Sequence, residues 1–253
     1  MIAKAPAVSV VMPAYNCEKY IEAAIRSVIS QTFTDWELIV IDDGSSDSTR
    51  EIIDRLAAED SRILSLPNEK NMGVAATRNR GIDISRGSYI ALLDSDDVWR
   101  EEKLERQLER LCETGADLCY CSYAIIDTVG KKAKKDYTVP ERVDLRGLLK
   151  ENCIGCSTVL LSRKALGERR FLTDYFHEDY VLWLDLLTDG VSAAGCVETL
   201  AEWRYFRNSR SFDKKQSAKN RWNIYRNHLG LSRVQSARMF LTYALRGLKK
   251  YFN

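Results

Sequence analysis

A cluster of acidic residues follows an apolar run in the segment YIALLDSDDVW, residues 89–99. In an extended chain, residues two apart project to the same side, so Asp94 and Asp96 should point the same way. Two carboxylates on one side suit Mg²⁺ or Mn²⁺, which proteins bind through one or two carboxylates together with substrate phosphates. Alternatively, Asp96 and Asp97 cap the helix that follows, although capping leaves Asp94 without a role. The residues alone leave both interpretations open.

Polar residues also follow two earlier apolar runs. Tyr15 and Asn16 come soon after the run at 7–12, and Asp43 follows the run at 36–41. A carboxylate at a strand end can accept hydrogen bonds from a nucleobase or from ribose hydroxyls, as acidic residues do in dinucleotide-binding folds. The alternative is that Asp43 is an ordinary turn residue.

These clusters fall within a regular alternation of β-rich apolar runs and amphipathic segments. The predicted strands span 7–12, 36–41, 62–67, 88–94 and 116–126, and the predicted helices span 18–31, 50–59, 73–85 and 100–115. The alternation predicts an α/β fold with a mostly parallel sheet and helices on both faces. Ligands bind at the carboxyl ends of strands in such folds, so the polar clusters should line one crevice. Further on we expect a polar loop at 130–144, a strand leading into a helix at 157–166, a helix at 178–190 and a helical segment at 214–253.

Composition describes an ordinary globular protein of 253 residues, 45% apolar and 29% charged. Its apolar runs are too short to span a bilayer, and the N-terminus lacks a secretory pattern, so we expect a cytoplasmic protein. The seven cysteines are scattered, and we expect reduced, buried thiols. Cys153 and Cys156 have metal or redox spacing, but a second ligand pair is not evident, which favours a structural role.

The C-terminal segment is strongly basic. From Arg204 onward there are 13 Lys and Arg residues against one acid, Asp213. An apolar stripe at helical spacing accompanies these cations and comprises Val234, Ala237, Leu241, Ala244, Leu245, Leu248 and Phe252. A basic amphipathic helix of this kind can lie in an anionic membrane interface. The alternative is a helix packed on the preceding domain with its charges solvated.

Four stretches of the chain resemble the family 2 glycosyltransferases of GT-A fold. They are the segment at 8–49, NMGVAATRNRGI at 71–82, GSYIALLDSDDVW at 87–99 and HEDYVLWLDLL at 177–187, so the resemblance runs from Val8 to about Leu187. It implies a GT-A catalytic domain at 1–212, with a nucleotide-binding half at about 1–98 and an acceptor half at about 99–212. The basic helical tail then spans 213–253.

The resemblance also assigns roles to individual residues. It implies that Asp179 is the catalytic base and that Asp96 ligates Mn²⁺ or Mg²⁺. It implies nucleotide-sugar binding by Pro13, Tyr15, Asn16, Asp43, Arg78, Asp94, Ser95 and Arg204. Acceptor or accessory roles are assigned to Asp97, Trp99, His177, Glu178 and Arg207.

One departure from the family pattern lies in WRYFRNSRS, residues 203–211. Many relatives carry a histidine where this chain has Phe206, and some of them use it near the metal. The resemblance therefore leaves Arg204 or Arg207 to hold the diphosphate. His177, close to the base, could meet the acceptor or cap the helix.

Together these features predict an inverting, metal-dependent hexosyl- or N-acetylhexosaminyltransferase of bacterial surface-polysaccharide assembly. The expected donor is a UDP-sugar, and the expected acceptor is a saccharide hydroxyl on a lipid-linked O-antigen, capsule or lipopolysaccharide intermediate. We expect attachment to the inner face of the cytoplasmic membrane through the tail, no nucleic-acid partner, and leave self-association open. The alternatives are a catalytically silent nucleotide-sugar-binding relative and a nucleic-acid-binding protein that uses the basic tail.

Overall fold

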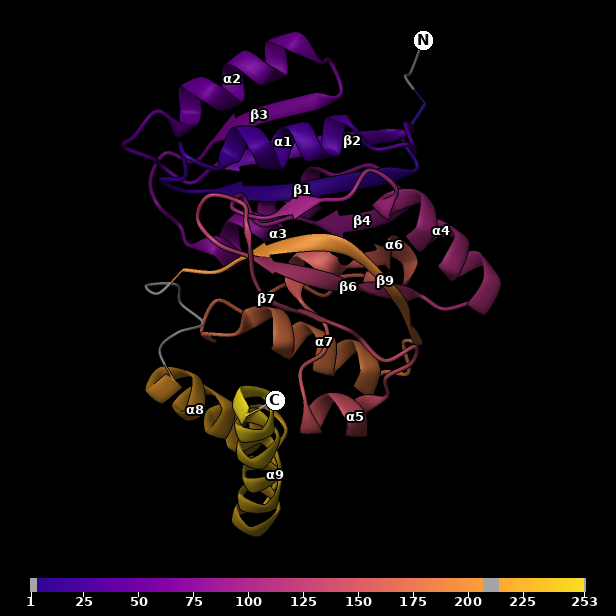
Figure 1. Ribbon diagram of the computed structural model, residues 1–253, viewed down its shortest axis with the longest axis vertical. Helices are drawn as coiled ribbons and strands as arrows, with labels where there is room; N and C mark the ends of the chain where they lie inside the picture. Colours follow the sequence, from indigo (N-terminus) through magenta and orange to yellow (C-terminus); the bar gives the residue numbers. More distant parts are fainter. Residues whose placement is uncertain (1–3, 207–213, 253) are drawn as a thin grey trace.

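The first half of the chain forms four parallel strands, which make up one side of the sheet in an α/β structure (Figure 1). The computed structural model describes residues 4–206 and 214–252. The strand order is β3-β2-β1-β4, and the strands are β1 (Val8–Ala14), β2 (Trp36–Asp42), β3 (Ile63–Pro67) and β4 (Tyr89–Leu92). Every residue of β1 and β2 is buried, which agrees with their continuous apolar sequence.

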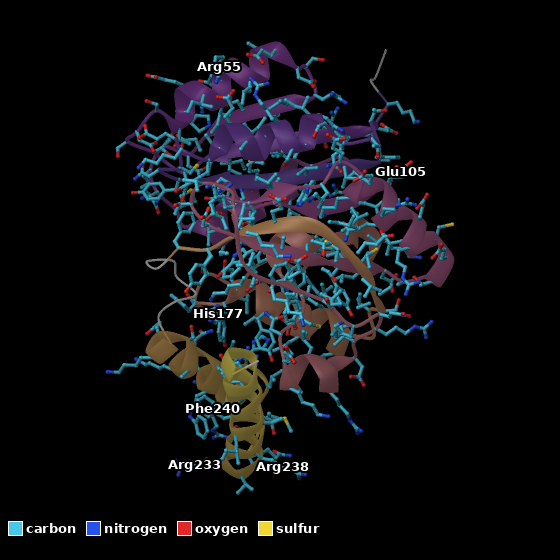
Figure 2. All side chains as sticks on the ribbon, in the orientation of Figure 1. Arg55, Glu105, His177, Arg233, Arg238 and Phe240 are labelled. Carbon is cyan, nitrogen blue, oxygen red and sulfur yellow. The ribbon has the colours of Figure 1, made fainter. Side chains whose placement is uncertain are left out.

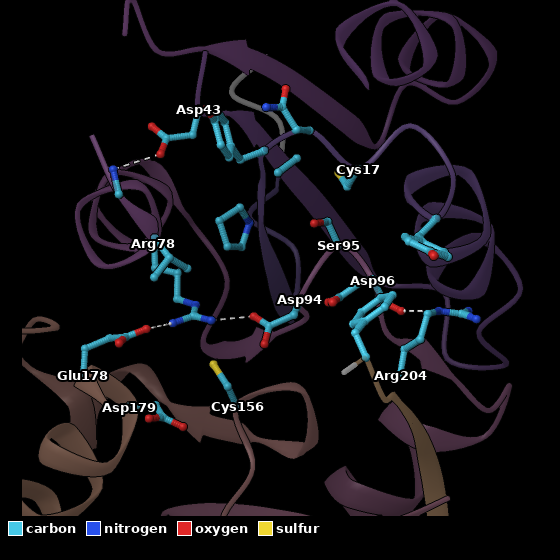
Figure 3. A pocket seen from close by; sticks show the side chains of 18 of the residues that line it. Cys17, Asp43, Arg78, Asp94, Ser95, Asp96, Cys156, Glu178, Asp179 and Arg204 are labelled. Carbon is cyan, nitrogen blue, oxygen red and sulfur yellow. Dashed lines mark hydrogen bonds and ion pairs between the residues drawn. The ribbon is translucent and has the colours of Figure 1, made fainter. Parts of the chain in front are cut away.

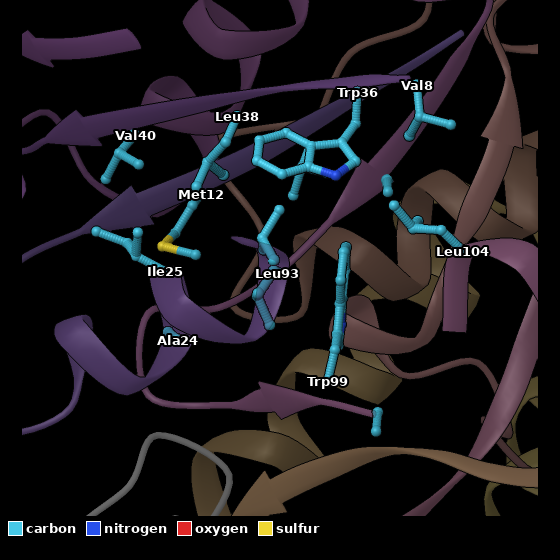
Figure 4. Packing of buried hydrophobic residues seen from close by; sticks show 14 of the residues in the cluster. Val8, Met12, Ala24, Ile25, Trp36, Leu38, Val40, Leu93, Trp99 and Leu104 are labelled. Carbon is cyan, nitrogen blue, oxygen red and sulfur yellow. The ribbon is translucent and has the colours of Figure 1, made fainter. Parts of the chain in front are cut away.

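Helices cover both faces of this parallel sheet. They are α1 (Ile21–Ile29), α2 (Thr49–Glu59) and α3 (Val74–Ile84). Successive residues of β1 point to opposite faces, so Met12 packs in one apolar layer with Ile25 of α1, and Val11 packs in another with Ile82 of α3. Figure 4 shows the first of these layers. The parallel sheet with helices on both faces is therefore confirmed for this half.

The second half of the sheet is mixed rather than mostly parallel. The order continues from β4 as β8-β6-β9-β5, and β7 pairs with β6. These strands are β5 (Val98–Trp99), β6 (Leu118–Ile126), β7 (Lys132–Tyr137), β8 (Leu160–Ser162) and β9 (Ala193–Arg204). Only β6 and β9 run parallel to each other in this half, and the other pairs are antiparallel. The predicted loop at 130–144 was wrong in part, because β7 forms a hairpin with β6 there.

Four helices accompany these strands. They are α4 (Lys103–Thr114), α5 (Leu145–Lys150), α6 (Arg163–Leu166) and α7 (Glu178–Thr188), and a 3₁₀ turn η1 (Cys156–Thr158) precedes β8. The helix predicted at 100–115 begins only at Lys103, because Val98 and Trp99 belong to a strand. Helix α7 matters most for the site, since its first turn carries the predicted base.

The C-terminal segment forms two helices with a break between them. Helix α8 (Lys214–Asn223) continues into a π turn η3 (Ile224–His228), and α9 (Arg233–Phe252) follows. Gly230 adopts a φ of +63° at the break, a conformation that glycine takes at little cost. His228 Nε2 lies 2.6 Å from Asp185 Oδ1 of α7, and the guanidinium of Arg221 lies 3.8 Å from the ring centre of Tyr180, so this segment contacts α7. Among the described residues, no helix combines the length and apolarity needed to cross a bilayer.

Candidate active site

A cavity of about 650 Å³ opens at the carboxyl ends of β1, β2 and β4. The polar clusters that follow these strands converge on it, as expected for a parallel α/β sheet. Residues from α7 and β9 close its other side (Figure 3). The predicted site residues that line this cavity are Pro13, Tyr15, Asn16, Asp43, Arg78, Asp94, Ser95, Asp96, His177, Glu178, Asp179 and Arg204.

Asp43 lies at one end of the cavity and holds the loop before α3. Its carboxylate accepts hydrogen bonds from the Asn68 amide at 2.6 Å and from the backbone N–H groups of Met72 and Gly73 at 2.9 Å. This network fixes the start of α3, which carries Arg78. Tyr15 is 51% exposed on the neighbouring loop, where its ring is available to a flat ligand such as a nucleobase.

The adjacent loop takes its shape from Asn16. This residue has a φ of +46°, which asparagine tolerates better than most side chains. Its backbone N–H donates to Ser45 Oγ at 2.9 Å, and its side-chain oxygen accepts from the N–H of Ser46 at 2.8 Å. The loops that follow β1 and β2 are therefore joined at the cavity rim.

Arg78 sits between two carboxylates at the centre of the site. Its guanidinium donates to Asp94 Oδ1 at 2.5 Å and to Glu178 Oε1 at 2.7 Å, as Figure 3 shows. Arg78 is only 4% exposed, and these anions raise its pKa well above the usual range despite its burial. The ion pairs join α3, the end of β4 and the first turn of α7. The partnership with Glu178 was not foreseen from the sequence.

Asp94 and Asp96 provide the chemistry of a cation site. Burial, and then the charge of Asp94, raise the pKa of Asp96 to about 6. Asp94 is already paired with Arg78, whereas Asp96 lines the cavity beside it. A hard divalent ion held by one carboxylate and by substrate phosphates would relieve this repulsion, so the residues present fit Mg²⁺ or Mn²⁺. Within the described residues, no group of three or more His, Cys, Asp or Glu side chains is placed to hold a metal by itself.

Asp97 and Trp99 face away from the large cavity. Asp97 is buried and accepts hydrogen bonds from Ser157 Oγ at 2.6 Å and from the N–H of Arg204 at 2.9 Å. Trp99 packs in the core, donates from Nε1 to the carbonyl of Ser157 at 2.7 Å, and lines neither this cavity nor the smaller one beside it. Since α4 starts at Lys103, after Glu102, the helix-capping alternative for Asp96 and Asp97 is wrong.

Asp179 lies in the first turn of α7, where it faces the cavity. Burial, and then the neighbouring charge of Glu178, raise its pKa to about 6, and Arg78 opposes this shift. Its Oδ1 accepts a hydrogen bond from the N–H of Tyr180 at 2.7 Å, which fixes the carboxylate at the helix start. His177 precedes the helix and pairs through Nε2 with Ser217 Oγ of α8 at 3.2 Å.

Arg204 is the last residue of β9, and its side chain binds the backbone of the acidic loop. Its side chain donates to the carbonyl of Asp96 at 2.8 Å and to the carbonyl of Asp127 at 3.0 Å. Phe206 lines the cavity where relatives are expected to have a histidine, and its ring centre lies 5.3 Å from that of Tyr20. Arg207, the other predicted diphosphate ligand, lies outside the described residues.

Several cavity residues were missed by sequence reasoning, namely Cys17, Tyr20, Cys156, Phe176 and Trp203. The sequence around Cys156 gave no indication of the site, because the packing of distant segments brings η1 to the cavity. All seven cysteines are free and all but Cys112 are buried, so the expectation of buried thiols is wrong for Cys112.

Comparisons with known proteins identify a family for this chain. The model of glycosyl transferase family 2 matches residues 9–176, a span that ends just before Asp179. The putative teichuronic acid biosynthesis glycosyltransferase TuaG of Bacillus subtilis is 37% identical over 245 residues, 97% of each chain. The Escherichia coli UDP-Glc:alpha-D-GlcNAc-diphosphoundecaprenol beta-1,3-glucosyltransferase WfgD is 38% identical over 251 residues, 96% of this chain and 94% of its own.

Solved structures resemble the whole described chain. S. aureus TarS 1–349 in complex with UDP superposes with a TM-score of 0.72 at 19% identity, over 96% of this chain and 72% of that one. The mannosyltransferase PcManGT from Pyrobaculum calidifontis, in complex with GDP-Man and Mn²⁺, gives a TM-score of 0.71 at 15% identity, over 96% and 74% of the two chains. At these identities the likeness concerns the fold, and it confirms the GT-A fold expected from the sequence.

Proposed function

This chain belongs to glycosyl transferase family 2 and is a glycosyltransferase of polysaccharide biosynthesis, and from that premise we propose that it transfers a sugar, with inversion, from a UDP-sugar to a saccharide hydroxyl on a lipid-linked acceptor. One observation carries the proposal. Asp96 and Asp179 line the same cavity, and the surroundings of each raise its carboxyl pKa to about 6. Perturbed carboxylates in one cleft are typical of catalytic sites.

The donor end of the cavity suits a nucleoside diphosphate. TarS was solved with UDP, and WfgD is named for UDP-Glc, which supports a UDP-sugar here. In our proposal the uracil lies near Tyr15 and Asp43, and the ribose lies near Asp94. A divalent ion bound by Asp96 and the diphosphate would stabilise negative charge on the departing nucleotide.

Asp179 is our proposed general base. A carboxylate with a pKa of about 6 is mostly ionised at neutral pH and still basic enough to accept a proton from an attacking hydroxyl. A single displacement on an α-linked donor gives a β linkage, which is the linkage in the name of WfgD. The acceptor hydroxyl would lose its proton to Asp179 as its oxygen bonds to the anomeric carbon and the nucleoside diphosphate leaves.

Replacing Asp179 by Asn tests this role. Asp179→Asn should keep the thermal stabilisation by UDP and lose transfer by at least about 100-fold, because general-base catalysis contributes roughly that much. Asp189→Asn, at the other end of the same helix in a surface ion pair with Arg169, is the matched control and should transfer normally. Normal transfer by Asp179→Asn would reject the assignment of the base.

We further propose that α9 attaches the enzyme to an anionic membrane surface at the cytoplasmic face. Val234 is 79% exposed and Leu241 is 61% exposed, whereas Ala244 is half-buried, so the first part of the apolar stripe is uncovered. Its members Leu245, Leu248 and Phe252 lie outside the described side chains. Arg233 and Arg238 lie on the same helix (Figure 2), which suits anionic headgroups.

Vesicle co-sedimentation tests this attachment. The variant Val234→Asp/Leu241→Asp should bind vesicles containing anionic lipid at least tenfold more weakly than wild type, because it places charge where apolar side chains would insert. A control, Leu64→Asp/Val197→Asp, changes two other exposed apolar residues on β3 and β9. Equal binding by wild type and the tail variant would reject the proposal.

A further inference from the structure

A second, smaller cavity of about 200 Å³ adjoins the large one behind Asp179. Asp94, Cys156, Asp179 and Trp203 line both cavities, so the proposed base stands where the two meet. The small cavity is additionally lined by Asp97, Tyr123, Gly155, Ser157, Thr158 and Ala201. Its volume lies below the roughly 300–1,000 Å³ typical of drug-sized ligands, which suits a single ring.

Aromatic rings form one wall of this small cavity and continue away from it across the sheet. Tyr123 of β6 and Trp203 of β9 are half-buried, and their ring centres are 6.3 Å apart. On one side Tyr137 of β7 stacks on Tyr123 with centres 5.2 Å apart, and on the other Tyr205 lies 6.2 Å from Trp203. The strand register explains this row of rings. Tyr123 lies opposite Tyr137 of β7 and opposite Ala201 of β9, and Trp203 is two residues further along β9, on the same face of the sheet as Ala201.

We propose that Tyr123 and Trp203 form the subsite that holds the acceptor's sugar ring, with the attacking hydroxyl directed at Asp179. A hexose presents an apolar face of C–H groups that packs on aromatic rings, and its hydroxyls need polar partners at the edge. The small cavity supplies both kinds of surface, the rings on one wall and the Asp179 carboxylate on another. This inference rests on the proposed function and specifies which residues select the acceptor.

The far end of the aromatic row is cationic. Lys134 Nζ lies 4.0 Å from the ring centre of Tyr205, and Lys135 is exposed on the same strand β7, where Lys132 pairs with Asp136 at 2.7 Å. A sugar joined to a lipid by a diphosphate carries its negative charge one ring away from the reacting hydroxyl. In our proposal the diphosphate of the acceptor extends from the subsite toward these lysines, which attract its negative charge.

Substitutions at Tyr123 test the subsite, because Tyr123 lines only the small cavity. With UDP-Glc as donor and an alkyl-diphosphate-linked GlcNAc as acceptor, Tyr123→Leu should raise the acceptor KM at least tenfold and leave the donor KM and the thermal stabilisation by UDP unchanged. Tyr123→Phe keeps the ring and should restore the wild-type acceptor KM. Trp203→Leu should also raise the acceptor KM, and Trp222→Leu, which changes a partly exposed tryptophan on α8, is the matched control.

The outcomes separate this inference from the proposed function. An unchanged acceptor KM in Tyr123→Leu, with wild type active, would reject the subsite alone. UDP stabilisation of wild type without transfer to or binding of the acceptor would reject both the subsite and the proposed acceptor class. Failure of wild type to bind UDP would reject the proposed donor. If Tyr123→Leu does not fold, the acceptor KM of Trp203→Leu decides.

Discussion

The guanidinium of Arg78 lies 2.7 Å from Glu178 Oε1, although the two residues are 100 positions apart in the sequence. This contact and the pairing of Arg78 with Asp94 join the parallel half of the sheet to the helix that carries Asp179. The arginine therefore sets the distance between the end of β4 and the proposed base. It also balances the charge of two carboxylates that face the same cavity.

Replacing Arg78 by Met should destabilise the protein by about 3–5 kcal/mol, the cost typical of removing one partner from a buried ion pair. Equilibrium unfolding in urea measures the effect. Arg169→Met, which removes the partly exposed partner of Asp189, is the control and should cost less than about 1 kcal/mol. Equal unfolding free energies for the two variants would contradict the structural role of Arg78.

Transfer by the wild-type enzyme should depend on pH with an apparent pKa of about 6. Asp179 must be deprotonated to act as a base, and protonation of Asp96 removes charge from the cation site. The rate should therefore fall as pH drops from 7 to 5 and level off above about pH 7. The two carboxyls titrate among coupled neighbours, so the profile reports them jointly. A rate that is constant from pH 5 to 7 would contradict the assignment.

The fold was predictable where burial leaves a continuous apolar signal. Strands β1 and β2 are such runs, and their boundaries agree with the sequence prediction within one or two residues. Strand β9 was not predicted, since charged residues such as Glu198 and Glu202 interrupt its sequence. Strand β7, KAKKDY, was interpreted as a loop because its exposed lysines give no apolar pattern, and only its pairing with β6 makes it a strand.

Site residues could be predicted where they lie close together in the sequence. The spacing of Asp94 and Asp96 suggested a cation site as one of two interpretations, and the resemblance to the family added Asp179 as the predicted base. Contacts between distant segments left no such signal. The pairing of Arg78 with Glu178 and the packing of Tyr123 against Trp203 depend on how the mixed half of the sheet closes onto the parallel half.

Asp96→Asn should stabilise the ligand-free protein while it abolishes the metal-dependent response to UDP. The pKa of Asp96 is about 6 in the folded protein, above its ordinary value of 3.8, so the folded state binds more protons than the unfolded chain between these limits. Wild-type stability therefore falls as pH rises through this window, and the penalty is complete above about pH 6. At pH 7.5 the variant should be more stable by ~3 kcal/mol, with the difference vanishing below about pH 4.

Thermal unfolding with UDP and Mn²⁺ measures the functional half of this prediction. Wild type should gain stability when both are added, and chelation of the metal should reverse the gain. Asp96→Asn should show no added effect of Mn²⁺. Asp83→Asn, which changes an exposed partner of Arg170, should behave as wild type. A full Mn²⁺ response in Asp96→Asn would place the cation elsewhere.

Lys103 should make the stability of the protein depend on alkaline pH. This lysine is fully buried between Trp99, whose ring centre lies 3.9 Å from Nζ, and Gln107, which accepts a hydrogen bond at 2.6 Å. Burial lowers its pKa to about 8 from its ordinary value of 10.5. The unfolded chain therefore binds more protons between these values, and stability rises with pH through this window.

Comparison with Lys103→Met isolates this contribution, because the other titrating groups are common to both chains. Between pH 7 and pH 11 the unfolding free energy of wild type should rise relative to that of Lys103→Met by about 3 kcal/mol. Lys164→Met, which changes an exposed lysine on α6, should show no pH-dependent difference. A constant difference between wild type and Lys103→Met across this range would mean that Lys103 keeps its ordinary pKa. Its burial beside Trp99 would then be offset by contacts to the ammonium group that outweigh the loss of solvation.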